Sequence, residues 1–159
     1  MNDSKQRKRG KAPIGNSSPA RVSVRNLQRT IRVNVVALQK FAAKALRACL
    51  KLNRGQAAGL AKLREISLVL VSDRRMSQLH RQFLHQRGPT DVLTFEHGEI
   101  FLSVPTAERN ARRFGNSLVR EMRLYIIHGL LHLHGFDDRT GRSAQEMEKM
   151  QAKILARLR

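Results

Sequence analysis

The 159-residue sequence has few of the residues that several protein classes require. Its single cysteine, Cys49, excludes an intrachain disulfide and fits a reducing compartment. Tryptophan is absent and tyrosine occurs once, which argues against nucleic-acid binding on an aromatic stacking platform. No apolar run approaches the roughly 20 residues that span a bilayer, and the N-terminus lacks the apolar core of a secretory signal. We therefore expect a cytoplasmic protein with neither a membrane nor a disulfide partner.

Acidic residues are scarce in the first part of the chain. Residues 1–64 contain 16 Lys or Arg and one acid, Asp3, whereas residues 65–159 contain 15 Lys or Arg and 11 acids. The formal net charge is +19. This excess favours a polyanionic partner, most commonly nucleic acid, held through its backbone by Arg and Lys. A solvated basic surface carrying a disordered arm is the alternative interpretation.

The hydropathy pattern predicts a polar tail followed by one domain. Residues 1–20 are basic and polar without periodicity, which is typical of a disordered tail. In residues 21–159 the apolar spacing predicts four strands and five helices, the first helix having a basic outer face. We expect strands at 21–27, 65–72, 91–95 and 99–103, a hairpin turn at 96–98, and helices at 33–52, 73–86, 105–114, 117–134 and 143–158. Asp73 is the expected N-cap of its helix.

The segment from His128 to Asp138 has the spacing of a metal site at the end of a helix. His128 and His132 are four residues apart, so both imidazoles lie on one helix face. Gly135 tolerates the left-handed conformation that ends a helix and reverses the chain, and Asp138 then returns toward that face. Three protein ligands with one open position is the pattern of catalytic zinc sites. A buried, hydrogen-bonded histidine pair is the alternative.

The residues around this constellation narrow the chemistry. Asp137 competes with Asp138 as a ligand, although a local hydrogen bond in the turn is its expected role. His134 points elsewhere on the helix, and we expect it at the surface. The spacing is also that of metzincin proteases, which carry a Glu general base directly after the first His. Gly129 occupies that position here, so a protease of this type would lack its base.

Three blocks of the sequence resemble the YbeY family, bacterial single-strand endoribonucleases implicated in ribosomal RNA maturation. The blocks are HGLLHLHGFDD at 128–138, PTDVLTF at 89–95 and GEI at 98–100, and the resemblance covers about residues 21–158. It implies a single α+β domain in which a small mixed four-stranded sheet is packed by about five helices. The metal site would stand at the end of a long helix behind a cleft lined by the basic face.

The resemblance also implies an activity. It points to a metal-dependent endoribonuclease that cleaves single-stranded RNA in ribosomal RNA maturation and ribosome quality control. Its ligands would be His128, His132 and Asp138, holding Zn²⁺, and its partners would be ribosomal RNA and the small ribosomal subunit. The family's last ligand is usually His, so Asp138 leaves room for another, harder divalent ion.

A second departure from the family lies before the PTDVLTF block. The family pattern L-N-x-x-Y-R ends in an Arg suited to gripping phosphate, and Leu84 occupies that position. Arg81, His85 and Arg87 are the candidates for supplying the missing charge and binding RNA. Asp91 and Glu99 are candidate general bases, although we expect Asp91 to organise the loop after Pro89 and Glu99 to face solvent at the hairpin.

Two other functions remain open on the sequence. One is a catalytically weak RNA-binding factor in ribosome assembly, suggested by Leu84 and Asp138. The other is a metal-dependent hydrolase of a different substrate, peptides included.

Overall fold

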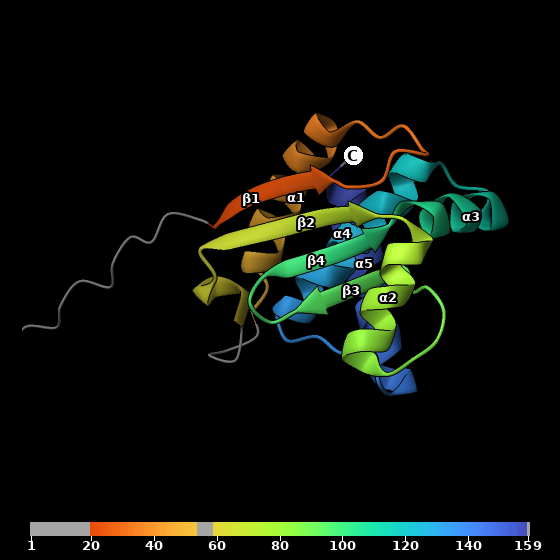
Figure 1. The fold of residues 1–159 in the computed structure, drawn as a ribbon. Coiled ribbons are helices and arrows are strands. Elements are labelled where there is room, and N and C mark those ends of the chain that lie inside the picture. Colours follow the sequence, from red (N-terminus) through yellow and green to blue (C-terminus); the bar gives the residue numbers. More distant parts are fainter. Residues whose placement is uncertain (1–19, 54–58, 159) are drawn as a thin grey trace, which may run out of the picture.

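The computed structural model describes residues 20–53 and 59–158 (Figure 1). Within them the chain forms ten elements, close to the predicted ranges. In order these are β1 (Arg21–Asn26), α1 (Val35–Leu50), the 3₁₀-helix η2 (Gly59–Lys62), β2 (Glu65–Val71), α2 (Asp73–Leu84), β3 (Val92–Phe95), β4 (Glu99–Ser103), α3 (Val104–Phe114), α4 (Leu118–Leu133) and α5 (Gly141–Arg157). Except for Ala20, the predicted tail at 1–20 lies outside the described residues.

The four strands form one mixed sheet in the order β1-β2-β4-β3. β1 pairs with β2 and β2 with β4 in parallel, and β3 pairs antiparallel with β4. The hairpin between β3 and β4 is the predicted one. At its turn Gly98 has φ 102°, and a Cβ there would lie 2.5 Å from the carbonyl oxygen of Glu65, so only glycine fits. The expected class, a small α+β domain with a mixed sheet and five helices, is confirmed.

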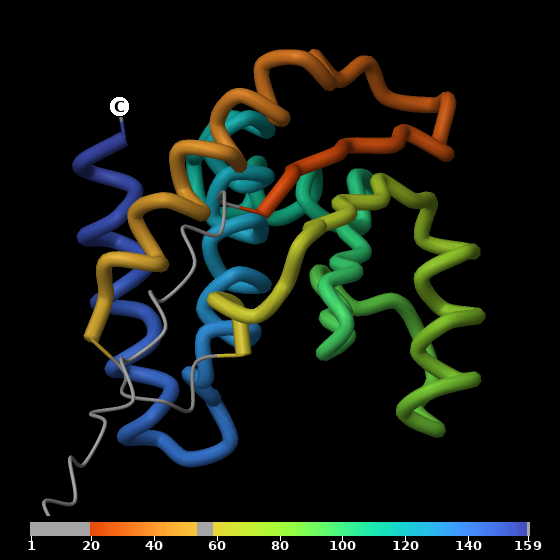
Figure 2. The backbone as a smooth tube through the Cα atoms, turned by 90° about the vertical axis from the view of Figure 1, so that its left-hand side faces the viewer, coloured from red at the N-terminus to blue at the C-terminus, as the bar shows by residue number. Residues whose placement is uncertain are grey.

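Alternating side chains give the sheet two apolar faces. Ile66, Leu68 and Leu70 of β2, with Ile100 and Leu102 of β4, are fully buried in the main core with α1, α4 and α5. Val69, Val71 and Phe101 point the opposite way into a smaller core that α2 covers. α4 therefore lies directly against one face of the sheet, and α1 and α5 lie on the same side. α2 covers the opposite face (Figure 2).

The start of α2 differs from the prediction. Ser72, not Asp73, is the N-cap, and its hydroxyl accepts from the backbone N–H of Arg75 at 3.3 Å. Asp73 instead accepts hydrogen bonds from residues of β4 and α3: Ser103 Oγ (2.6 Å), Thr106 Oγ1 (2.8 Å) and Arg109 Nη1 (2.6 Å). Burial raises the pKa of Asp73, but these bonds outweigh it and the net pKa is lowered. Asp73 thus joins three elements.

Turn residues set the other helix ends. Ser117 caps α4 as predicted, accepting from the N–H of Arg120 at 3.2 Å. Gly115 ends α3 in the left-handed conformation, also as predicted. α2 stops at Leu84, earlier than expected, because His85 adopts a left-handed φ of 55°. In the described part of the chain, every helix falls short of the length and apolarity needed to traverse a bilayer.

Candidate metal site

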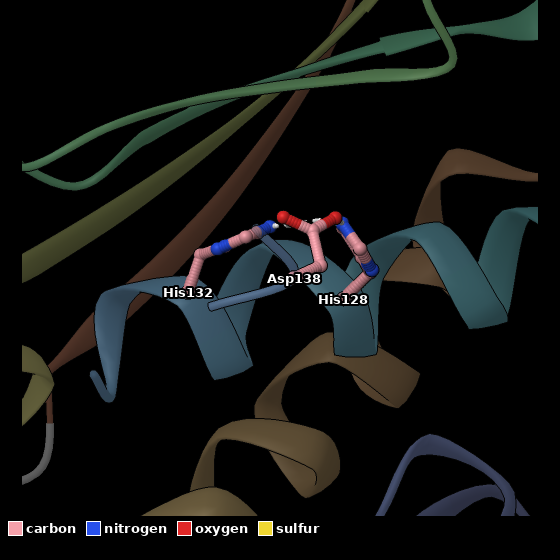
Figure 3. A group of neighbouring side chains, drawn as sticks. All are labelled: His128, His132 and Asp138. Carbon is pink, nitrogen blue, oxygen red and sulfur yellow. Dashed lines mark hydrogen bonds and ion pairs between the residues drawn. The ribbon is translucent and has the colours of Figure 1, made fainter. Parts of the chain in front are cut away.

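α4 carries the two histidines on one helix face. Most other side chains of the helix are buried, because it packs between the sheet and the outer helices. His128 and His132 are about one-quarter exposed, with side-chain values of 25% and 28%. Their Nε2 atoms lie 2.9 Å apart, and Figure 3 shows both rings turned toward the same point above the helix. The i, i+4 spacing therefore places the two rings as predicted.

The other nitrogen of each ring is held by a hydrogen bond. His132 Nδ1 donates to the carbonyl oxygen of Phe136 at 3.2 Å. His128 Nδ1 donates to Oε1 of Gln151 on α5 at 2.8 Å. Each neutral ring then presents an Nε2 lone pair to the other across 2.9 Å. Two lone pairs so close repel each other unless a cation lies between them. Gln151 was not anticipated from the sequence, because nothing in its local pattern marks it.

The chain returns to the histidines through a tight reversal after α4. Gly135 has φ 94°, a conformation that glycine adopts without strain. Phe136 follows it and is only 5% exposed, so it anchors the reversal in the main core. Asp138 consequently faces the imidazoles, with Oδ2 3.8 Å from Nε2 of His128 and 3.9 Å from Nε2 of His132 (Figure 3).

The electrostatics favour a neutral His132 ring. Burial lowers the pKa of His132, and the neighbouring His128 lowers it further, while the Asp138 carboxylate opposes both effects. The net direction is downward, so a proton shared between the rings is disfavoured at neutral pH. A histidine with a free Nε2 lone pair and an occupied Nδ1 is the form in which imidazole coordinates metals.

The donor set suits one small divalent cation. One ligand atom from each of His128, His132 and Asp138 lies within 4.8 Å of the other two. The separations of 2.9, 3.8 and 3.9 Å are all shorter than two metal–ligand bonds of about 2.0–2.1 Å laid end to end. Two imidazoles and one carboxylate are ligands that zinc accepts, and three protein ligands leave a position open.

Asp137 and His134 have structural roles. Asp137 Oδ1 accepts from Ser143 Oγ at 2.9 Å and from the N–H of Arg139 at 3.1 Å, which lowers the pKa of Asp137 and braces the start of α5. This is the local role expected for it. The expectation for His134 was wrong: its side chain is not at the surface but buried, 2% exposed. Its Nε2 donates to the carbonyl oxygen of Leu52 at 3.0 Å, linking the end of α4 to the segment after α1.

Gly129 marks the closest approach of α4 to the sheet. A Cβ at this position would lie 2.7 Å from Cγ2 of Ile100 and 3.3 Å from Oγ1 of Thr94. The position directly after the first histidine therefore faces strands β3 and β4 and has no space for a side chain. A glutamate general base of the metzincin kind could not be accommodated there without moving the helix off the sheet.

The two candidate bases are engaged elsewhere. Glu99 begins β4 and pairs with Arg25 and His97, both at 3.3 Å. Its neighbour Ile100 packs toward α4, so Glu99 lies on the opposite face of the sheet. Asp91 Oδ1 accepts from the N–H of Val92 at 2.8 Å and organises the entry to β3.

The three candidate RNA-binding residues lie at the end of α2 and in the loop after it. Arg81, His85 and Arg87 are all exposed. Among the described residues, no hydrogen bond or ion pair joins their side chains to the His128–His132–Asp138 group. Leu84 is also exposed, at 50%, and offers no donor at the position where the family carries Arg.

Comparison with known proteins places this geometry in a family. The family model described as Endoribonuclease YbeY matches residues 23–159. The Endoribonuclease YbeY of Moorella thermoacetica is 39% identical over 119 residues, covering 63% of this chain and 76% of that protein. The one from Pelotomaculum thermopropionicum is 33% identical over 152 residues, covering 86% and 96%.

A solved structure has the same fold. The solution structure of TM1509 from Thermotoga maritima aligns with a TM-score of 0.58 at 28% identity, over 86% of this chain and 88% of that one. The resemblance carried by the three sequence blocks is therefore confirmed over nearly the whole described chain. The chain belongs to the YbeY endoribonuclease family.

Proposed function

We propose that this protein is a metal-dependent endoribonuclease that cleaves single-stranded RNA and acts on ribosomal RNA during its maturation and quality control. His128, His132 and Asp138 would be its ligands for one divalent cation, with Zn²⁺ the first choice. The small ribosomal subunit is the proposed partner and the cytoplasm the proposed location. Support comes from family membership, since its relatives are named endoribonucleases.

One observation carries the metal dependence. The Nε2 atoms of His128 and His132 face each other at 2.9 Å, while both Nδ1 atoms already donate to Gln151 and Phe136. Neither ring can relieve this contact by turning without losing its hydrogen bond. The carboxylate of Asp138 adds negative charge on the same side. Together these groups form a site preorganised for a cation.

The remaining chemistry follows from which groups are free to act. A bound divalent cation would supply a Lewis acid for a phosphoryl oxygen and hydroxide near neutral pH. Asp91 and Glu99 are engaged in the contacts described above rather than with the group of His128, His132 and Asp138, which we call the triad. Gln151 and the carbonyl of Phe136 fix the imidazole rings in their ligating orientation. Arg81, His85 and Arg87 are the proposed contacts for RNA phosphates.

The test is a cleavage assay on purified full-length protein with Zn²⁺ restored after chelation. We expect wild type to cleave single-stranded RNA and His128→Ala to lose cleavage to background. His97→Ala is the matched control, because His97 is exposed on the β3–β4 hairpin and forms an ion pair with Glu99, outside the metal-ligand group. Equal cleavage by wild type and His128→Ala would refute the proposal.

The same assay separates the two alternatives. Salt-sensitive RNA binding by wild type without cleavage would identify an assembly factor. Metal-dependent hydrolysis of a peptide with RNA left intact would identify a different hydrolase. The variant Asp138→His restores the residue that the family usually carries at this position. If residue 138 is a metal ligand, this variant should bind Zn²⁺ and still cleave RNA.

A further inference from the structure

The outer face of α1 carries a stripe of positive charge that the metal site does not use. Lys40, Lys44, Arg47 and Lys51 follow one another at spacings of four, three and four residues, so they lie on one helix face. The stripe extends about 16 Å along the helix. All four side chains are exposed, and α1 contains no acidic residue. The buried face of α1 is apolar and fills the main core.

This stripe borders a groove between α1 and α5, which lie side by side in Figure 2. Ala48, Leu52, Met150 and Ile154 contribute apolar surface to the groove. Its basic residues are Lys44, Arg47, Lys51, Lys153 and Arg157. We call these basic residues, together with the apolar surface, the α1–α5 groove. Among the described residues, no Asp or Glu lines it. The two acids of α5, Glu146 and Glu148, belong to the first half of that helix.

The charges of the groove are not neutralised within the described protein. None of its five basic side chains forms an ion pair or hydrogen bond with another described residue. Some cations elsewhere are paired, as Arg109 is with Asp73 at 2.6 Å and Arg25 with Glu99 at 3.3 Å. Five unpaired cations around one groove repel each other, and a polyanion laid along it would relieve that repulsion.

We infer that the α1–α5 groove is a second RNA-binding surface, which holds the phosphate backbone of a single strand away from the cleavage site. The choice of RNA rests on the proposed function. The groove supplies several cations in a row, and no aromatic side chain lines it in the part of the chain that the structure describes, so it suits the backbone rather than the bases. A membrane surface fits less well, because an interfacial helix inserts its apolar face in lipid, and that of α1 is buried in the core.

α5 separates the groove from the triad. Gln151 bonds to His128, whereas Lys153 lies two residues further on, about 200° around the helix, and lines the groove. A strand held in the groove must therefore pass around α5 to reach the triad. Long RNA engages both surfaces, and a short oligonucleotide at the triad cannot reach the groove.

The experiment removes four groove charges in the full chain: Lys44→Gln, Arg47→Gln, Lys153→Gln and Arg157→Gln. Binding is followed by fluorescence anisotropy of a labelled single-stranded RNA of about 20 nucleotides, with salt varied between about 50 and 200 mM. We expect each lost contact to reduce the slope of log K against log salt by about 0.7, and affinity near 0.1 M salt to fall on the order of 100-fold.

The matched control removes four exposed arginines elsewhere: Arg74→Gln, Arg75→Gln, Arg112→Gln and Arg113→Gln. These lie on α2 and α3, and α3 packs mainly on α4 and α2. The control should retain affinity and slope, and neither variant should have an unfolding midpoint below that of wild type. Cleavage of an oligonucleotide of about five nucleotides should be unchanged by the groove variant, while KM for long RNA rises.

Each other outcome decides the inference. Equal loss in groove variant and control, or no loss in either, overturns it. Wild-type binding to vesicles of about 30% phosphatidylserine that the groove variant loses, with RNA binding intact, overturns it in favour of a lipid surface. If RNA binding depends on the groove but the protein cleaves no RNA, the inference about the groove is supported and only the proposed function is contradicted. The two results can be told apart because binding is measured without cleavage.

Discussion

The two sides of α5 face two different kinds of surface. On the inner side Gln151 fixes one imidazole through a single 2.8 Å hydrogen bond. On the outer side Lys153 and Arg157 add charge to a groove where no particular geometry is imposed. The inner surface depends on where a few atoms point, and the outer surface depends on how many charges are present. Substitutions on the inner side should therefore act independently of salt, whereas those on the outer side should be graded and salt-sensitive.

The largest effect that would sharpen this contrast is expected at Gln151. Gln151→Ala removes the acceptor that orients His128, and such losses reduce metal affinity by about 10- to 100-fold. Zn²⁺ competition against a chromogenic chelator measures the change. Gln151→Glu keeps an oxygen acceptor and should bind nearly as well as wild type. Lys153→Gln, on the outer side of the helix, should leave the metal affinity unchanged. If Gln151→Ala bound Zn²⁺ like wild type, the hydrogen bond would have no orienting role.

The next effect tests the packing beneath the histidines. A Cβ in Gly129→Ala would stand 2.7 Å from Ile100 Cγ2, inside contact distance, so Ile100 or α4 must shift. Overpacking of this kind costs about 1–3 kcal/mol of unfolding free energy, measurable by urea denaturation of the metal-free protein. Gly141→Ala is the control, because nothing lies within 4 Å of its added Cβ. Equal stability of both variants would mean that α4 is not tightly seated on the sheet.

The smallest expected effect is a difference in pH dependence between the metal site and the groove, which lie on the two sides of α5. The pKa of His132 lies below its ordinary value of 6.5 because of burial and the neighbouring His128. The unfolded chain therefore takes up a proton at higher pH than the folded chain does. The unfolding free energy of the metal-free protein is fully retained above about pH 6.5 and declines as pH falls toward the folded pKa.

Zn²⁺ affinity should decline with acidification in the same direction, since protons compete for Nε2. The groove-dependent part of RNA binding rests on Lys and Arg, which stay charged between about pH 5 and 8. That part is the affinity difference between wild type and the groove variant, and it should be flat across this range. His132→Ala should flatten the pH dependence of unfolding. A groove component that followed the Zn²⁺ curve would break the contrast between the two sides.

What could be predicted from sequence was local. The spacing of His128 and His132 fixes a shared helix face wherever α4 packs, and Gly135 permits a chain reversal directly after the helix. The strands and helices followed from periodicity within each segment. The three blocks resembling the family were sufficient to anticipate the α+β fold with its mixed sheet.

What could not be predicted depends on contacts between distant segments. The burial of His134 could not be predicted, because the residue that accepts its hydrogen bond, Leu52, is 82 residues away in sequence. Asp73 does not cap α2, because its carboxylate instead accepts hydrogen bonds from residues 30 to 36 positions further along the chain. Gln151 became part of the site because α5 packs on α4, which no spacing within α5 reveals. The basic face of α1 was foreseen, but not that it would border a groove with α5.

The bond between Gln151 and His128 also has a dynamic consequence. Because the side chain of Gln151 holds the first imidazole, that ring can turn freely only after this hydrogen bond breaks. The lifetime of the bond then sets an upper limit on how fast the ring reorients. Rotation of the His128 ring should therefore be faster in Gln151→Ala than in wild type.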